Sequence, residues 1–263
     1  MGLNVHDGAG PARALILAAG RGERMRPLTD HCPKPLLPVR GQPLLQWWLD
    51  ALARGGVRDV VVNTAWLGDQ IESYFGLQRP PDGRSQLSNN ELSVRCSSEG
   101  RDFGYALETA GGIARALPLL APQPHDVFWV MAGDIFAPDF VISADAVQRF
   151  AASGLLAHLW LVPNPPHNLK GDFAIGPDGL AQNEAPAGGQ RHTFSTVALY
   201  RRALFEPPWC DILPGNPQGT AAPLAPLLRR AIAAGQISAE LYTGPWTDVG
   251  TPERLAALND CAG

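Results

Sequence analysis

A glycine-rich, basic segment near the N-terminus is the part of this chain best suited to chemistry. It reads Leu17-Ala-Ala-Gly-Arg-Gly-Glu-Arg-Met-Arg-Pro-Leu-Thr29 and is followed by Pro33-Lys34-Pro35. Glycines let backbone N–H groups approach an anion without obstruction by side chains. Positive charge is added by Arg21, Arg24, Arg26 and Lys34. Together these features predict a loop that binds a polyphosphate.

Two common phosphate-binding patterns do not fit this segment. Gly20 and Gly22 are not followed by the third glycine that the dinucleotide fingerprint uses for close helix packing. The Walker pattern ends in Gly-Lys-Ser/Thr, which this segment lacks. A lone Gly-x-Gly would more simply be a structural turn, so the prediction rests on the extended string.

Lysine is scarce in this chain, and one of its lysines lies in the segment. Of the 21 basic residues only Lys34 and Lys170 are lysines. In a chain so biased toward arginine, a position that remains lysine favours a compact ammonium over a planar guanidinium. We therefore predict that Lys34 is a phosphate ligand.

Two carboxylates could complete the phosphate site with a divalent cation. Asp134 follows an apolar run at 127–131, and Asp248 precedes a helix that we expect over 252–258. Mg²⁺ prefers oxygen ligands and keeps several waters. Turn or helix capping is the alternative role for both residues. They are far apart in the sequence, so a shared site depends on the fold.

The apolar runs predict an α/β fold that would position these residues. We expect strands at 14–19, 59–63, 92–96, 127–131, 155–162, 193–200 and 237–242, with a hairpin around Pro177-Asp178-Gly179. We expect helices at 44–52, 67–75, 109–117, 222–234 and 252–258, and a surface loop at 76–90. Alternating strands and helices are typical of a doubly wound sheet with right-handed crossovers. Such sheets bind ligands beyond the carboxyl ends of their strands.

The extended string resembles the signature of the sugar-phosphate nucleotidyltransferases. Gly41-Gln-Pro-Leu44, Gly133-Asp134, Gly171-Asp-Phe173 and Trp246-Thr-Asp-Val-Gly-Thr251 also fit, so the resemblance covers nearly all of residues 13–260. It implies a Rossmann-like, doubly wound mixed sheet with an inserted sugar-binding β region. It also implies transfer of a nucleoside monophosphate from NTP to a sugar 1-phosphate, with release of pyrophosphate. No C-terminal β-helix repeat follows the α/β core.

Within that family, three short sequence motifs favour one group of substrates. Gly22–Pro27, Ala65–Gly68 and Leu107–Thr109 are similar to the N-acetylmuramate 1-phosphate uridylyltransferases of peptidoglycan recycling, which favours UMP transfer. Those enzymes resemble one another in an Asn-Gly-Asp motif, whereas this chain has Ala132-Gly133-Asp134 at that position. Mannose-1-phosphate guanylyltransferases and glucose-1-phosphate thymidylyl- or uridylyltransferases remain alternatives. A non-catalytic nucleotide-sugar-binding regulatory protein is a further alternative.

The resemblance also implies roles for individual residues. The expected catalytic residues are Arg24, Lys34 and Asp134, and the expected Mg²⁺ ligands are Asp134 and Asp248. The expected nucleotide-binding residues are Ala18, Ala19, Gly20, Gly22, Glu23, Arg24, Lys34, Asn63, Glu99, Thr109 and Gly111. The expected sugar-binding residues are Gly171, Asp172, Glu184 and Thr193. As an alternative, Asp172 and Glu184 would be ordinary solvent-exposed charges of a hairpin, and Thr193 would be an ordinary strand residue.

Composition argues against nucleic-acid and membrane partners, and small-molecule substrates (UTP or another NTP and a sugar 1-phosphate) are expected from the resemblance. The chain has 25 acidic against 21 basic residues and a net charge of −4, which argues against a general nucleic-acid binder. No apolar run approaches the roughly 20 residues that span a membrane. The four cysteines form no CxxC pair, so we expect no zinc site and a reduced, cytoplasmic setting.

One nucleotidyltransferase domain is expected for most of the 263 residues. Residues 1–12 are predicted to be a flexible tail, and 13–263 the domain. Within it, 13–150 should mainly bind the nucleotide, 151–250 should mainly bind the sugar, and 251–263 should form a C-terminal helix. Because no β-helix follows to assist trimerisation, a monomer or small homo-oligomer is expected.

Overall fold

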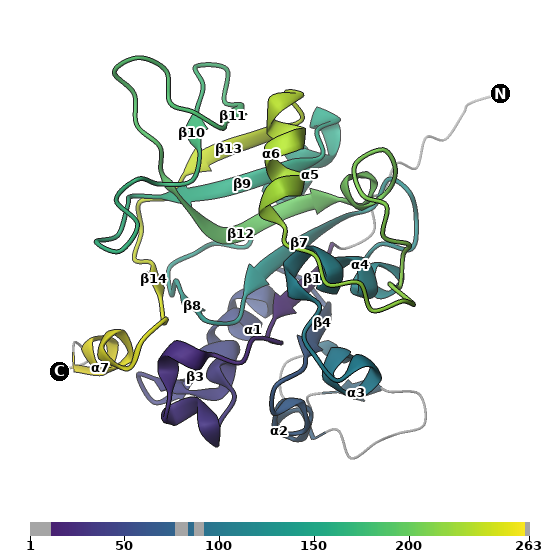
Figure 1. Ribbon diagram of the computed structural model, residues 1–263, viewed down its shortest axis with the longest axis vertical. Helices are drawn as coiled ribbons and strands as arrows, with labels where there is room; N and C mark the ends of the chain where they lie inside the picture. Colours follow the sequence, from purple (N-terminus) through teal and green to yellow (C-terminus); the bar gives the residue numbers. More distant parts are fainter. Residues whose placement is uncertain (1–11, 77–83, 87–91, 261–263) are drawn as a thin grey trace.

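One mixed sheet runs through the whole fold of the computed structural model, which describes residues 12–76, 84–86 and 92–260 (Figure 1). The sheet has eight strands in the order β13-β9-β12-β7-β1-β4-β6-β5. Their bounds are β1 Arg13–Leu17, β4 Asp59–Thr64, β5 Arg84–Gln86, β6 Ser93–Ser98, β7 Val127–Ala132, β9 Ala157–Val162, β12 Thr193–Arg201 and β13 Ile237–Leu241. Strand β12 is antiparallel to β7 and β9, and β5 is antiparallel to β6, whereas β7, β1, β4 and β6 are parallel. The predicted doubly wound mixed sheet is thereby confirmed.

Helices cover both faces of this sheet. Helices α4 and α6 pack with one apolar cluster, and α1, α2 and α5 pack with another. Along β1, Leu15 belongs to the first cluster, whereas Ala14 and Ile16 belong to the second, as the alternation of side chains in a strand requires. Because both faces are covered, the central strands are continuous apolar runs in the sequence.

The remaining elements are short and lie mostly in the connections. The helices are α1 Leu44–Arg54, α2 Gly68–Tyr74, α3 Glu99–Phe103, α4 Glu108–Leu120, α5 Ala144–Ser153, α6 Ala225–Ala233 and α7 Pro252–Asp260. The 3-10 helices are η1 Glu23–Met25, η2 Leu28–Asp30, η3 Lys34–Leu36 and η4 Arg202–Phe205. The small strands are β2 Pro38–Val39, β3 Gln42–Pro43, β8 Ile135–Phe136, β10 Ala174–Ile175, β11 Ala181–Gln182 and β14 Thr247–Asp248. No described helix is long and apolar enough to cross a bilayer.

A third apolar cluster anchors the basic segment that follows β1. Met25 of η1 is fully buried in this cluster. Phe136 of β8, Val249 beside β14 and Leu255 of α7 belong to it as well. The basic segment, the continuation of β7 and the C-terminal helix are therefore packed together, although they are far apart in the sequence.

Several elements differ from those that the sequence predicted, besides α3, the 3-10 helices and the short strands of the connections. The expected loop at 76–90 contains β5, which pairs with β6 and forms the edge of the sheet. Helix α4 continues past Pro118, because Gly215 N donates to the Ala114 carbonyl that Pro118 leaves without its helical partner. Helix α5 was not expected, and it buries only Val147 and Phe150. Apart from Ala12, the predicted N-terminal tail lies outside the described residues.

Candidate active site

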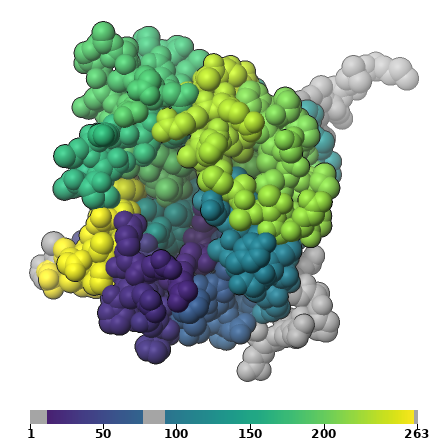
Figure 2. Space-filling view, in the orientation of Figure 1, coloured from purple at the N-terminus to yellow at the C-terminus, as the bar shows by residue number. Residues whose placement is uncertain are grey.

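A cavity of about 890 Å³ opens at the carboxyl ends of β1, β4 and β7. Leu17, Asn63 and Ala132, from the ends of these three strands, line it. Figure 2 shows the hollow between the purple N-terminal segment and the yellow-green segment that contains α6. Because open α/β sheets bind ligands at this edge, the cavity is the candidate active site.

The backbone of the basic segment forms one wall of this cavity. The lining includes Ala18, Ala19, Gly20, Gly22 and Glu23. Gly22 has a φ of +66°, and a Cβ there would lie 3.0 Å from Cγ2 of Thr29. The Thr29 hydroxyl in turn donates to the Gly22 carbonyl over 2.8 Å. Only glycine fits this turn without strain, which is why the second glycine of the pattern is needed.

The basic side chains of this segment separate into two groups. Arg24 and Lys34 line the cavity. Arg26 instead forms an ion pair within the loop, and the Arg21 guanidinium lies 4.5 Å from the Trp66 ring centroid. Arg24 and Lys34, the two basic residues of the segment that were expected to bind nucleotide, therefore line the cavity, whereas Arg21 and Arg26 have other partners.

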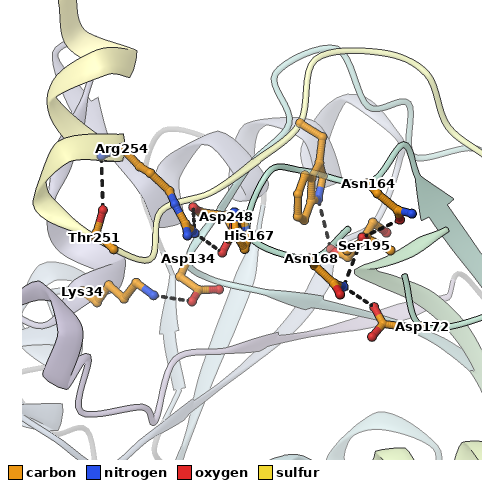
Figure 3. Close-up of polar contacts among 12 residues, drawn as sticks. Lys34, Asp134, Asn164, His167, Asn168, Asp172, Ser195, Asp248, Thr251 and Arg254 are labelled. Carbon is orange, nitrogen blue, oxygen red and sulfur yellow. Dashed lines mark hydrogen bonds and ion pairs between the residues drawn. The ribbon is translucent and has the colours of Figure 1, made fainter. Parts of the chain in front are cut away.

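Lys34 and Asp134 form an ion pair in the cavity wall. The Lys34 Nζ lies 2.5 Å from the Asp134 Oδ2, and Lys34 is only 9% exposed (Figure 3). Asp134 reaches this position because Gly133 N donates to the Leu17 carbonyl over 2.8 Å, which joins the end of β7 to the end of β1. The structure thus brings a cation and an anion together where the sequence predicted a phosphate site.

Asp248 is brought to Asp134 by the pairing of two short strands. Asp248 of β14 pairs with Ile135 of β8, and Val249 N donates to the Asp134 carbonyl over 2.9 Å. Figure 3 shows the two aspartates beside each other. The fold therefore brings together the two carboxylates that the sequence predicted as a pair.

Both oxygens of the Asp248 carboxylate have basic partners. The Arg254 Nη1 lies 2.5 Å from Oδ2, and the His167 Nε2 lies 3.1 Å from Oδ1. All three residues line a second cavity, of about 700 Å³. The N-terminus of α7 is capped by the Thr251 hydroxyl, which accepts from Arg254 N over 3.4 Å. The capping alternative for Asp248 is therefore replaced by an ion-pair role, and the sequence analysis missed Arg254 and His167.

The donor chemistry of the two aspartates fits a Mg²⁺ site. Their carboxylates are the oxygen donors that Mg²⁺ prefers. Among the described residues no group of three or more His, Cys, Asp or Glu side chains could hold a metal ion. Two protein carboxylates together with phosphate oxygens and waters would complete the usual six ligands.

Glu99 lies behind the cavity wall rather than in it. Asn63 lines the cavity, its Oδ1 accepts from Ala18 N, and its Nδ2 donates to Glu99 Oε1, both over 2.7 Å. Glu99 is fully buried, and its Oε2 accepts from Leu107 N over 2.7 Å. Burial raises the pKa of this carboxyl, and its two hydrogen bonds oppose the rise. The expected direct contact with nucleotide is therefore corrected to support of Asn63 and the basic segment.

Thr109 and Gly111 of α4 have different surroundings. Thr109 lines the cavity. Gly111 N donates to the Ala222 carbonyl over 3.2 Å, and a Cβ on Gly111 would lie 2.4 Å from the Thr220 carbonyl oxygen. Gly111 therefore permits close packing of α4 on residues 220–222, and the expectation that it faces the nucleotide is corrected.

Asp172 is the predicted sugar-binding residue that lines the cavity. Its Oδ2 accepts from Phe194 N over 2.8 Å and from Asn168 Nδ2 over 3.2 Å. Gly171 precedes it with a φ of +62°, and a Cβ there would lie 2.6 Å from the Arg191 carbonyl carbon. Gly171 thus shapes the turn that aims Asp172.

Thr193 and Glu184 lie outside the cavity lining. Thr193 is buried, and its hydroxyl bonds to Asn164 and Asn168 over 3.0 and 3.2 Å. The Glu184 side chain is 81% exposed, and its Oε2 lies 3.5 Å from the Arg191 Nη1. Neither residue lines the cavity: the Thr193 hydroxyl shares the Asn168 amide with Asp172 behind the wall, and Glu184 points to solvent.

Several lining residues were not expected from the sequence. They are Ala106, Glu108, Phe173, Phe194, Thr196, Tyr200, Leu228 and Arg229. Glu108 has a φ of +56°, which is uncommon for a residue other than glycine and often marks functional sites. Apart from Phe173, which belongs to the Gly171-Asp-Phe173 motif, no sequence pattern separated these residues from ordinary helix and strand positions, because facing the cavity depends on how distant elements pack.

Comparison with known proteins adds an independent line of observation. Residues 13–261 match the nucleotidyl transferase family. The chain is 43% identical over 251 residues to an N-acetylmuramate alpha-1-phosphate uridylyltransferase of Neisseria meningitidis serogroup B, covering 95% of this chain and 98% of that one. It is 30% identical to a protein of the same name from Caulobacter vibrioides, covering 94% and 96%.

Solved structures share the fold at low identity. A putative glucose-1-phosphate thymidylyltransferase of Bacillus anthracis superposes with a TM-score of 0.73 at 19% identity, covering 95% of each chain. A UDP-glucose pyrophosphorylase of Acinetobacter superposes with a TM-score of 0.69 at 16% identity, covering 95% of this chain and 92% of that one. These likenesses agree with the Rossmann-like sheet described above.

Proposed function

This chain belongs to the nucleotidyl transferase family, and we propose that it transfers UMP from UTP to N-acetylmuramate 1-phosphate. The products are UDP-N-acetylmuramate and pyrophosphate, as peptidoglycan recycling would use them. The observation that carries the proposal is the position of Arg24, Lys34 and Asp134 in one cavity at the carboxyl ends of the strands. The choice of nucleotide and sugar is supported by two relatives of that activity that match over nearly their whole length.

The reaction needs positioning and charge neutralisation more than proton transfer. An oxygen of the sugar phosphate attacks the α-phosphorus of UTP, and a new P–O bond forms. The bond from the α-phosphorus to the oxygen bridging to the β-phosphate breaks, and pyrophosphate leaves with its electron pair. The attacking oxygen is already anionic, so no general base is required. Holding two polyanions together in line is the main task of the protein.

Two cationic side chains would oppose the charge of the phosphates. Lys34 is mostly buried, so its ammonium acts where water screens it little. Arg24 is exposed in the cavity and forms no ion pair among the described residues. The backbone N–H groups of the basic segment would bind the same oxygens. Asn63 and Thr109, on the same side of the cavity, would contact the base or ribose.

Asp134 and Asp248 would hold the Mg²⁺ ion at the phosphates. When bound, the ion would neutralise charge on the phosphate oxygens and orient them. Arg254 and His167 hold the Asp248 carboxylate in place (Figure 3). These two residues would therefore position a ligand without touching substrate.

Asp172 would accept hydrogen bonds from the hydroxyls of the sugar. Its Oδ2 already has two donors within the protein, which fix the carboxylate in the wall. Glu184 points into solvent and is given no direct contact. We also propose that the protein acts in the cytoplasm, where UTP is available, as a monomer or small homo-oligomer. The free thiols of Cys32, Cys96 and Cys210 support a reducing compartment.

A direct assay tests this function. Purified protein, UTP, N-acetylmuramate 1-phosphate and Mg²⁺ are combined, pyrophosphate release is followed continuously, and the sugar product is identified by mass. We expect pyrophosphate and UDP-N-acetylmuramate in equal amounts. Omitting either substrate should stop release. A folded protein that forms no pyrophosphate from this pair would show that the proposed function is wrong.

A further inference from the structure

The cavity contains a third cationic side chain, far along the chain from the basic segment. Its lining includes the cations Arg24, Lys34 and Arg229. Arg24 and Lys34 belong to the wall that the basic segment forms, which we call the phosphate wall, whereas Arg229 lies on α6. Figure 1 shows α6 in the upper part of the molecule and the purple N-terminal segment in the lower part. Arg229 lines the cavity together with Asp172 and Phe173, and so belongs to the proposed sugar side.

Two contacts hold Arg229 in this wall. Its guanidinium carbon lies 5.3 Å from the ring centroid of Phe173, which is itself only 3% exposed. The Asn183 side-chain amide donates to the Arg229 backbone carbonyl over 2.9 Å, which ties α6 to the β10–β11 hairpin. Stacking on a buried ring restricts the guanidinium and leaves its N–H groups available at the edge of the plane.

Arg229 forms no ion pair among the described residues, whereas several other arginines of the chain do. Arg191 pairs with Glu184, Arg202 with Glu206 and Arg254 with Asp248. The nearby Asp172 carboxylate accepts instead from Phe194 N and Asn168. A planar cation that is stacked in a substrate cavity without an internal acid is suited to bind a carboxylate in bidentate fashion.

We propose that Arg229 binds the carboxylate of an acidic sugar 1-phosphate and thereby selects this class over neutral sugars. This inference rests on the proposed function, in which the sugar is N-acetylmuramate 1-phosphate. That sugar carries a lactyl ether whose carboxylate Asp172 would repel. Arg229 supplies the cation that such a substituent needs, while Asp172 faces hydroxyls on another part of the ring.

The test compares two sugars that differ by the lactyl group alone. The kcat/KM of the full-length protein with UTP is measured for N-acetylmuramate 1-phosphate and for N-acetylglucosamine 1-phosphate. Variants are Arg229→Ala, Arg229→Gln and Arg229→Lys. The matched control is Arg230→Ala, which removes the same charge from the next position of α6, where the side chain donates to the Trp209 carbonyl outside the cavity. Thermal unfolding verifies that each variant is folded.

Arg229→Ala and Arg229→Gln should lower kcat/KM for the muramate substrate about tenfold to a hundredfold, since a hydrogen bond to a charged group is lost. They should leave the glucosamine substrate within about twofold, and Arg229→Lys should retain part of the preference. Equal losses for both sugars, or an unchanged preference in folded Arg229→Ala, would overturn the inference alone. A wild-type protein that prefers the neutral sugar would overturn the proposed function as well.

Discussion

The two sides of the cavity are built in different ways. The phosphate wall comes from one stretch of chain between Leu17 and Lys34, which Met25 fastens to a core cluster. The sugar wall combines single side chains from separate elements, such as Asp172 near β10 and Arg229 of α6. Binding phosphates uses backbone N–H groups, which need a contiguous conformation, whereas binding a sugar uses side chains that any packed element can supply. The first side should therefore carry the chemistry and the second the choice of sugar.

Replacing Lys34 should have the largest effect on turnover. Lys34→Ala removes a charge-assisted donor from a site with little water, which costs on the order of 3 kcal/mol and lowers kcat/KM by at least about a hundredfold. Lys34→Arg should also be impaired, because a planar fork does not replace a compact ammonium. Steady-state kinetics of the folded variants measure both effects.

Lys170 offers a matched control for this prediction. It is the other lysine of the chain, it is exposed, and it does not line the cavity. Lys170→Ala should keep kcat/KM within about twofold, as is usual for surface substitutions. Normal turnover in folded Lys34→Ala would contradict a catalytic role for the phosphate wall.

The aspartate pair should control the metal requirement. Asp134→Asn and Asp248→Asn each remove a charged ligand, so each should lower activity at limiting Mg²⁺ by at least about tenfold and raise the Mg²⁺ concentration for half-maximal rate. A chelator should abolish activity without shifting the thermal midpoint. The exposed Asp211 supplies the control Asp211→Asn. Wild-type Mg²⁺ dependence in both variants would contradict a shared cation.

Glu99 should matter for stability, because it supports the phosphate wall from behind. Glu99→Ala leaves Asn63 Nδ2 and Leu107 N without their acceptor in a buried site, where each unpaired group costs about 1–3 kcal/mol. Chemical denaturation should show a loss of at least about 2 kcal/mol in the unfolding free energy. Glu184→Ala, at an exposed position, should change it by less than about 0.5 kcal/mol. Equal stability of the two variants would contradict the supporting role.

The smallest effects should come from the two acidic residues that were predicted to bind the sugar. Replacing Asp172 should weaken sugar binding more than replacing Glu184. Asp172→Asn should raise the KM for the sugar phosphate about tenfold, because one charged acceptor for a hydroxyl is lost. Glu184→Gln should change it by less than about twofold, since the exposed ion pair with Arg191 contributes little. The reverse order would place Glu184, rather than Asp172, against the substrate.

The phosphate wall could be predicted from the sequence because its residues are contiguous and their types follow from the chemistry. Gly22, Arg24 and Lys34 all line the cavity as expected. The central strands were also predictable, because sheets covered on both faces require unbroken apolar runs. The pairing of Asp134 with Asp248 followed only from family resemblance, since the pattern of residues does not reveal that β8 and β14 meet.

The sequence could not predict which side chains face the cavity. Glu99 and Gly111 do not line the cavity: the Glu99 carboxylate is bound by Asn63 and Leu107 N, and Gly111 packs against residues 220–222. Arg229 was hidden in an ordinary amphipathic helix, and its role depends on stacking against Phe173 of a distant hairpin. Such positions depend on packing between elements, which leaves no local pattern in the chain.

One measurement tests most directly whether the cavity joins UTP on its phosphate side to an acidic sugar on the other. It is a matrix of kcat/KM values for UTP, GTP and dTTP against the 1-phosphates of N-acetylmuramate, glucose and mannose, scored by pyrophosphate release. UTP with N-acetylmuramate 1-phosphate should exceed GTP with mannose 1-phosphate by at least about tenfold, the worth of one well-placed charged contact. A higher value for GTP with mannose 1-phosphate would contradict the account of the sugar side, and Ala132, in the cavity wall, would be the first residue to examine.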